Sequence, residues 1–344
     1  MSNNKRRLMA EWERQSAVML TWPHEKTDWA WILDEVDAVY SKICHAIARR
    51  EQVLIVVRDA NHQKHIEQCI NDSSTLQQCV FVQAASNDSW ARDHGPISVM
   101  QNNELLLLDF QFNGWGGKYE SGLDNVISQL IQQQAGFKCE FNTLPLILEG
   151  GSIESDGDGT LLTTKQCLLT PTRNPQLNQQ AIEKILQTEF GIERFLWLSE
   201  GHLAGDDTDA HIDTLARFCN PETIAYCSCN DSNDEHYAGL KAMENQLQAM
   251  RTRNNQPYKL IPLPIPAARH ADDGRRLPAT YANFLIINNA VLLPIYNDKN
   301  DTIAIQNLTQ AFPQHSIETI DCSAIIKQYG SLHCLTMQLA AGVI

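Results

Sequence analysis

Cys334 lies in a segment that differs from the surroundings of the other cysteines. Gly330 and Ser331 precede it and His333 is its neighbour, whereas the nine other cysteines lie in apolar or loop stretches. A thiolate is a strong nucleophile, but most cysteines in proteins are small buried apolar residues. Cys334 alone therefore leaves a catalytic role and a packing role open.

Two segments far upstream contain the groups that a catalytic thiolate would need. Residues 206–213 hold four aspartates and His211, and residues 87–93 hold Trp90 and Asp93. A guanidinium cation presents a planar fork of N–H donors, and carboxylates bind that fork bidentately. A thiol, a histidine and several carboxylates therefore indicate a nucleophilic enzyme that acts on a small cationic guanidinium substrate.

These residue types suggest an order of steps for the hydrolysis of a guanidinium. Cys334 would attack the central carbon, and His211 would protonate the departing ammonia as a general acid. His211 would then act as a base on the water that hydrolyses the thiouronium. Asp93 and Asp213 would hold the plane of the cation. Trp90 would stack on the cation or exclude solvent, although it could also simply pack.

The composition is that of a soluble globular protein and excludes some partners. The chain has 344 residues, 43% of them hydrophobic and 20% charged, with a formal net charge of −14. Such acidity argues against a nucleic-acid surface. It suits a cationic ligand, although it also aids solubility. No stretch reaches the 18 apolar residues of a membrane span, so no membrane partner is predicted.

The cysteines and the N-terminus bear on compartment and cofactors. The basic residues 5–7 are not followed by an apolar segment, so we expect no signal peptide and a cytoplasmic protein with reduced thiols. Cys227 and Cys229 lack the second ligand pair of a structural zinc site. We expect no metal and no organic cofactor, and the sequence leaves a homodimer open.

A hairpin unit recurs along the chain. In each copy a polar cluster leads into an apolar strand, a turn and a second apolar strand, within residues 93–109, 149–169, 211–227 and 281–294. Apolar residues at helical spacing predict helices within residues 34–49, 123–134, 179–191 and 234–251. Further strands are predicted at 51–57 and 316–320, and a last short element begins at Cys334.

About five such units indicate a closed, pseudo-symmetric α/β array, because a single unit cannot bury its own apolar face. No linker or shift in composition divides the chain, so we expect a single domain over residues 1–344. In a closed array the polar residues that begin each hairpin reach one common end. The residues that would converge there with Cys334 are Asp93, Glu149, His211, Asp213 and Asn283.

Motifs along nearly the whole chain carry a resemblance to a known family. They lie at residues 9–13, 20–24, 90–96, 112–117, 148–152, 207–213, 281–284 and 332–336. With these motifs the sequence resembles the agmatine deiminase family. This family belongs to the guanidine-modifying superfamily, which also contains bacterial-type peptidylarginine deiminases.

The resemblance implies a fold, an activity and roles for particular residues. The fold would be a pentein-type propeller of five ββαβ blades. The activity would be hydrolysis of agmatine to N-carbamoylputrescine and ammonia through a covalent Cys334 intermediate. His211 would be the acid and base, Asp93 and Asp213 would grip the guanidinium, and Trp90 would line the pocket.

Other residues near these motifs are predicted to bind substrate or to have structural roles. The further substrate-binding candidates are Glu149, Trp115, Asp207 and Asn283. The acidic stretch around Asp207 would attract the far amine of a diamine-like substrate, or would form a solvated loop. His211 and Asp213 would share one face of a strand. His333 would point away from Cys334 on a strand and is predicted to be structural.

Alternative functions stay open. A peptidylarginine deiminase is the nearest, but members with that activity tend to be exported. A free-arginine deiminase would need a cation for the substrate carboxylate, and Arg173, Arg217 and Arg269 are candidates. A Cys-His-Asp acyl hydrolase would need an oxyanion hole and one orienting acid rather than two. The last alternative is an inactive propeller that binds a cationic metabolite.

Overall fold

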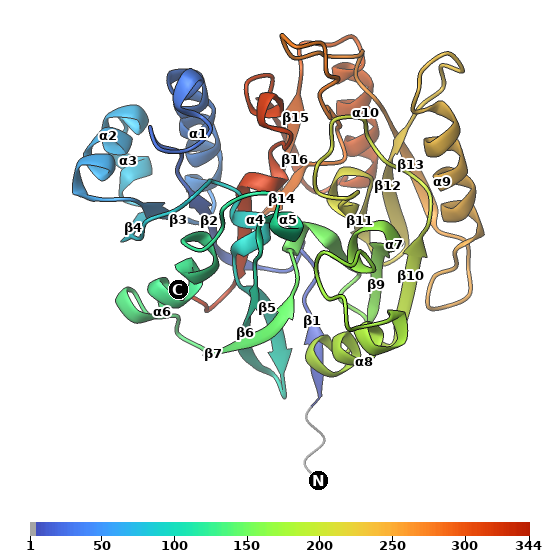
Figure 1. Cartoon of the computed structure of the whole chain (residues 1–344), viewed down its shortest axis with the longest axis horizontal. Coiled ribbons are helices and arrows are strands. Elements are labelled where there is room, and N and C mark those ends of the chain that lie inside the picture. Colours follow the sequence, from blue (N-terminus) through green and yellow to red (C-terminus); the bar gives the residue numbers. More distant parts are fainter. Residues whose placement is uncertain (1–4) are drawn as a thin grey trace.

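A computed structural model describes residues 5–344 as a mixed α/β structure. Its strands form five sheets, with the longer helices on the outer sides of the sheets (Figure 1). Each sheet contains an antiparallel strand pair and at least one parallel strand reached through a helix. Within these residues no helix combines the length and the apolar character needed to cross a bilayer.

The strand pairing confirms the four hairpins expected from the turn residues. The antiparallel pairs are β5 (Ile97–Gln101) with β6 (Glu104–Gln111), β8 (Ile153–Ser155) with β9 (Thr160–Thr164), β11 (Ala216–Asn220) with β12 (Thr223–Ser228), and β14 (Leu285–Ile287) with β15 (Ala290–Ile295). Asn103 and Asn289, at two of the tight turns, have positive φ values of 68° and 63°. Asparagine tolerates this left-handed conformation better than most residues.

A helix connects each hairpin to a parallel strand. The helical spacing predicted the helices within residues 123–134, 179–191 and 234–251, but not the helix at residues 301–311. The helices are α6 (Ile127–Gln134), α7 (Lys165–Leu168) with α8 (Gln179–Phe190), α9 (Tyr237–Ala249) and α10 (Asp301–Ala311). The strands that follow them are β7 (Glu140–Ile147), β10 (Arg194–Leu198), β13 (Lys259–Pro264) and β16 (Ser316–Asp321). Asn178 caps α8 by accepting a hydrogen bond from the backbone N–H of Ala181.

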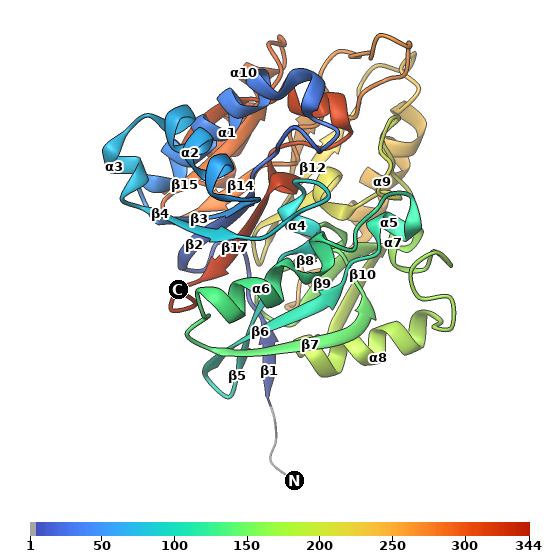
Figure 2. The same ribbon diagram turned by 60° about the vertical axis from the view of Figure 1, so that its left-hand side comes forward.

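The fifth sheet joins the two ends of the chain (Figure 2). β17 (Thr336–Ala340) pairs antiparallel with β2 (Gln15–Thr21), and β2 continues through α1 (Leu33–Ala48) to the parallel strand β3 (Gln52–Val57). α2 (Ala60–Ile70) and α3 (Ser73–Leu76) lead to β4 (Cys79–Gln83) at the edge. β1 (Arg6–Leu8) pairs with β5 in another sheet.

Two local predictions were wrong. Residues 167–169 were expected to form part of a strand, but they lie at the end of α7. The reason is that the Thr164 hydroxyl accepts a hydrogen bond from the backbone N–H of Cys167 and caps a helical turn. His211 and Asp213 do not share the face of a strand. They lie at the start of the 3₁₀ turn η4 (Ile212–Thr214), and strand β11 begins only at Ala216.

Short helical turns directly before β5, β8, β11 and β17 position most of the polar residues. They are α4 (Ala91–His94), η3 (Gly150–Ser152), η4 and η6 (His333–Leu335). α4 contacts both η3 and η6, and η3 contacts η4. Figure 1 shows α4 near the centre of the molecule, between the sheets. The polar residues carried by these turns therefore meet at the middle of the fold.

Candidate active site

Cys334 lies on η6 with 4% of its surface exposed. The side-chain amide of Asn283 donates to its sulfur over 3.3 Å, and the amide oxygen accepts from the backbone N–H of Cys334. The sulfur is also 3.7 Å from Oδ2 of Asp213. The thiol is thus held between an amide and a buried carboxylate.

Asp93 and Asp213 are the two carboxylates whose charges act on this thiol and raise its pKa. Asp93 accepts from Nε1 of Trp115 over 2.9 Å and from the backbone N–H of Gly151 over 3.0 Å. Asp213 accepts from Nδ1 of His333 over 2.8 Å through Oδ2. Within residues 5–344 the other oxygen of Asp213, Oδ1, has no hydrogen-bond partner.

Gly151 marks the point where these side chains approach one another most closely. A Cβ atom at this position would lie 2.5 Å from Nδ1 of His211 and 2.9 Å from Oδ1 of Asp93. It would also lie 3.2 Å from Oδ2 of Asp213. Only glycine leaves room for the imidazole and the two carboxylates to meet around one backbone atom.

His211 is fully buried, and neither of its ring nitrogens has a hydrogen-bond partner in the described part of the chain. Its Nδ1 lies 3.7 Å from Oδ1 of Asp93. A carboxylate oxygen of Glu149, the sulfur of Cys167 and a ring nitrogen of His211 lie within 4.8 Å of one another. These are donor types that metals bind. Nε of Arg173 donates to Oε1 of Glu149 over 3.0 Å, and Oε2 of Glu149 has no hydrogen-bond partner among the described residues.

A pocket leads from Cys334 and Asp93 to the surface. Its walls include the acidic residues Asp28, Asp88 and Asp207 and the aromatic residues Trp90, Trp115, Tyr119 and Tyr329. The ring of Trp90 packs so closely on Gly330 that a Cβ there would lie 2.2 Å from it. Tyr119 donates to Asp207 over 2.8 Å. The opening is therefore acidic and aromatic.

Burial and mutual repulsion oppose negative charge at the base of this pocket. Burial, reinforced by Asp213 and Asp93, raises the pKa of the Cys334 thiol well above its usual value. Burial, followed by the charges of Asp213 and Glu149, raises the pKa of Asp93. Burial lowers the pKa of His211 to about 3. At neutral pH Cys334 is thus a thiol and His211, behind the pocket wall, is a neutral imidazole, and a bound cation would favour the ionised forms of Cys334 and Asp93.

The structure brings the sequence-predicted site residues together, although they occupy different positions in the site. Asp93, Trp90, Trp115, Asp207 and Cys334 line the pocket. Asp213, Asn283, His211 and Glu149 lie behind this wall, and the first two contact Cys334 directly. The sequence had indicated neither Tyr119 nor Asp28 as a pocket residue, because each lies outside both the hairpin starts and the motif segments.

The prediction that His333 points away from the site was wrong. On the turn η6 successive side chains do not alternate between two faces as they do on a strand. His333 therefore bonds to Asp213 through Nδ1 and to Glu11 through Nε2. Glu11 lies in the motif at residues 9–13, so the sequence marked it as a residue of interest. Only the fold shows that His333 is its partner.

Comparison with known proteins gives the family. The sequence matches the Porphyromonas-type peptidyl-arginine deiminase family over residues 7–340. The chain belongs to this family. A Vibrio parahaemolyticus protein named as a candidate agmatine deiminase is 34% identical, and the alignment covers 96% of each chain.

Solved structures of similar proteins resemble this member of the family closely. A candidate arginine deiminase from Porphyromonas gingivalis is 45% identical with a TM-score of 0.94, over 99% of this chain and 100% of that one. A cysteine-to-serine variant of the C. jejuni agmatine deiminase, with substrate bound, is 38% identical with a TM-score of 0.93. That match covers 100% of this chain and 99% of the other.

Proposed function

We propose that the chain is an agmatine deiminase, a C–N hydrolase that converts agmatine to N-carbamoylputrescine and ammonia. The observation that carries the proposal is a buried cysteine at the base of an acidic, aromatic pocket, with His211 and two carboxylates around it. Relatives that are 34–38% identical along nearly the whole chain bear the agmatine deiminase name. The residue types at the site match the chemistry of a guanidinium.

In the proposed mechanism the guanidinium plane lies between Asp93 and Asp213, and Trp90 covers it from one side. The cation lowers the pKa of Cys334, the thiol proton passes to the neutral imidazole of His211, and the thiolate attacks the guanidinium carbon. Collapse of the tetrahedral adduct breaks one C–N bond, and the nitrogen leaves as ammonia after accepting a proton from His211. A water molecule, deprotonated by His211, then attacks the thiouronium carbon and releases Cys334.

We also propose an architecture for the whole chain. The five sheets would be the blades of one pseudo-symmetric propeller, and the chain would form a single catalytic domain. Support comes from the ββαβ order within the sheets and from the pairing of β2 with β17, which joins the two ends of the chain. In such a ring, turns α4, η3, η4 and η6 would surround the central axis, with Asn283 just ahead of β14.

The far end of the pocket favours an amine over a carboxylate. Asp207 and Asp88 line the wall, whereas the arginines considered as partners of a substrate carboxylate are bound elsewhere. Arg173 pairs with Glu149 and donates to the backbone of Thr208. Arg217 is fully buried between Glu11 and Glu154. Arg269 donates to the backbone oxygen of Tyr296.

The proposal is tested by ammonia release from agmatine, free arginine and an arginine blocked at both ends. We expect kcat/KM for agmatine to exceed that for free arginine by at least ~10²-fold, because the arginine carboxylate would meet the pocket's acidic wall without a cation to pair with it. Asp207→Asn should reduce this preference, whereas the exposed and distant Glu104→Gln should not. Equal rates on agmatine and free arginine would contradict the assignment, and preference for the blocked arginine would favour a peptidylarginine deiminase.

A further inference from the structure

His333 is buried, with both ring nitrogens bonded to carboxylates. Nδ1 lies 2.8 Å from Oδ2 of Asp213, and Nε2 lies 2.7 Å from Oε2 of Glu11. A neutral imidazole has only one N–H, so it would leave one carboxylate facing a ring lone pair. Two such contacts require either an imidazolium or a proton on one of the carboxyl groups.

The guanidinium of Arg217 opposes a proton on Glu11. Burial alone would raise the pKa of Glu11, but Arg217, which donates to it over 2.7 Å, outweighs burial and the pKa is lowered. Arg217 also lowers the pKa of Asp213, in addition to the contact with His333 itself. Both carboxyl groups are therefore less favourable places for the proton than their burial alone would make them.

The groups that face His333 are close to balanced in charge without it. Glu11 and Asp213 lie beside the guanidinium groups of Arg92 and Arg217, and burial raises the pKa of the third carboxyl group, that of Glu154, to about 7. Burial and then these two guanidinium groups lower the pKa of His333, so they oppose its protonation. The two direct carboxylate contacts decide in favour of the imidazolium, because a neutral ring cannot satisfy both.

We propose that His333 is a positioning residue, a buried imidazolium that Glu11 keeps charged and that holds Asp213 ionised and oriented. The Nδ1–H group of His333 donates a hydrogen bond to Oδ2 of Asp213. The other oxygen, Oδ1, can then accept a hydrogen bond from the guanidinium of the substrate. The kinetic consequence rests on the proposed deiminase function. The charge of the ring does not depend on that function and can be measured separately.

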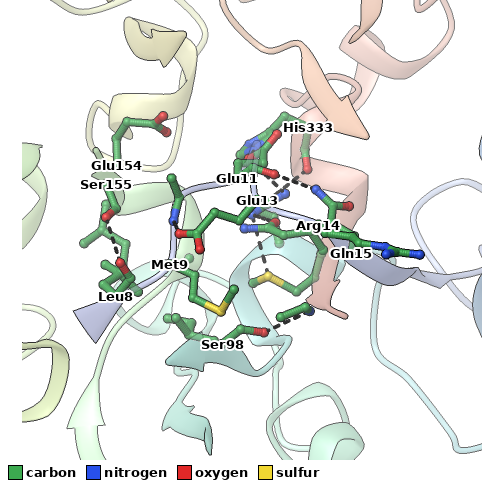
Figure 3. Close-up of a pocket in the computed structure, with 18 residues that line it drawn as sticks. Leu8, Met9, Glu11, Glu13, Arg14, Gln15, Ser98, Glu154, Ser155 and His333 are labelled. Atoms are coloured by element: carbon green, nitrogen blue, oxygen red, sulfur yellow. Dashed lines mark hydrogen bonds and ion pairs between the residues drawn. The ribbon is translucent and has the colours of Figure 1, made fainter. Parts of the chain in front are cut away.

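Glu11 acts from outside the guanidinium pocket. It lines a second cavity together with His333, Arg92 and Glu154, and Figure 3 shows Glu11 next to His333 there. None of these four residues lines the pocket that leads to Cys334. Glu11 can therefore be changed without removing a substrate contact. Glu154 offers a matched control, since it pairs with Arg217 over 2.6 Å but has no bond to His333.

The direct test is nitrogen NMR of the full-length protein labelled with ¹⁵N-histidine, with His333 assigned by loss of its signal in His333→Gln. We expect both ring nitrogens of His333 to carry protons at neutral pH in the wild-type protein. In Glu11→Gln one proton should be lost, whereas Glu154→Gln should keep both. A singly protonated ring in the wild-type protein would overturn the proposal, even if Glu11→Gln failed to fold.

The kinetic test compares KM and kcat for agmatine at neutral pH. In Glu11→Gln the neutral ring no longer holds Asp213 as firmly in its ionised, oriented form, so KM should rise by about tenfold with a smaller change in kcat. Glu154→Gln should leave KM unchanged. An equal rise of KM in both variants would mean a general effect of the buried cluster and would contradict the proposal. Absence of agmatine turnover would refute the proposed function alone, because the NMR result would still decide the charge of His333.

Discussion

Asp93 and Asp213 are held by different groups, although both are buried carboxylates beside the same pocket. Asp93 accepts from neutral donors, the Trp115 indole and the Gly151 backbone, and burial raises its pKa. Asp213 is bonded to His333, which outweighs burial and lowers its pKa. On the proposed mechanism Asp93 gains most from a bound cation, while Asp213 is ionised beforehand.

Asp93→Asn keeps the shape of the side chain and removes its charge. We expect kcat/KM for agmatine to fall by at least ~10²-fold, because a charge-assisted hydrogen bond is worth roughly 1.5–3 kcal/mol and the position of the substrate also suffers. Steady-state kinetics of the folded variant measure this. Near-wild-type kinetics would count against a role for Asp93 at the guanidinium.

The sequence predicted which residues form the site, but not which hydrogen bonds they make. The motifs singled out Cys334, His211, Asp93 and Asp213, and the fold places all four around the base of the pocket or behind it. The bond between His333 and Glu11 joins residues 322 positions apart, and local spacing contains no trace of it.

The elements that position the site are short helical turns, not the strands. Hairpins could be predicted because turn residues between apolar runs leave a clear signal. The turns α4, η3, η4 and η6 are three or four residues long, too short to show a helical period. For this reason the sequence predicted that the residues at the hairpin starts converge. It did not predict the backbone conformation at His211 and His333.

Gly151 tests the importance of turn η3. A methyl group there would press on the His211 ring and the Asp93 carboxylate, so Gly151→Ala should reduce kcat/KM by at least ~10²-fold, as misplacement by about 1 Å can do. Gly122→Ala is the control, since a Cβ at Gly122 would have no atom within 4 Å. Full activity of Gly151→Ala would show that the side chains need not crowd around this turn.

At the scale of the whole molecule, Arg217 connects segments from distant parts of the sequence. It donates to Glu11 in the N-terminal segment, to Glu154 on β8 and to the backbone oxygen of Phe284 just before β14. Its side chain is fully buried. The packing of these three segments against one another therefore depends on a buried ion cluster as well as on apolar contacts.

Arg217→Met should leave Glu11 and Glu154 buried without their main partner. Breaking a buried ion pair from one side costs about 3–5 kcal/mol, so the free energy of unfolding should fall by that amount in denaturant titrations. Arg253→Met removes an arginine that is 42% exposed and paired with Glu193, and should cost less than about 1 kcal/mol. Equal losses in the two variants would contradict a central role for the cluster.

In the proposed mechanism a bound guanidinium supplies the positive charge that the pocket lacks, and this charge ionises Cys334. The direct measurement is a pH titration of thiolate absorbance, wild type minus Cys334→Ala, with and without an unreactive guanidinium ligand. Burial and the two aspartates raise the pKa of the free thiol well above its usual value, so the ligand should move the midpoint to lower pH. An unchanged midpoint with the ligand bound would contradict the account.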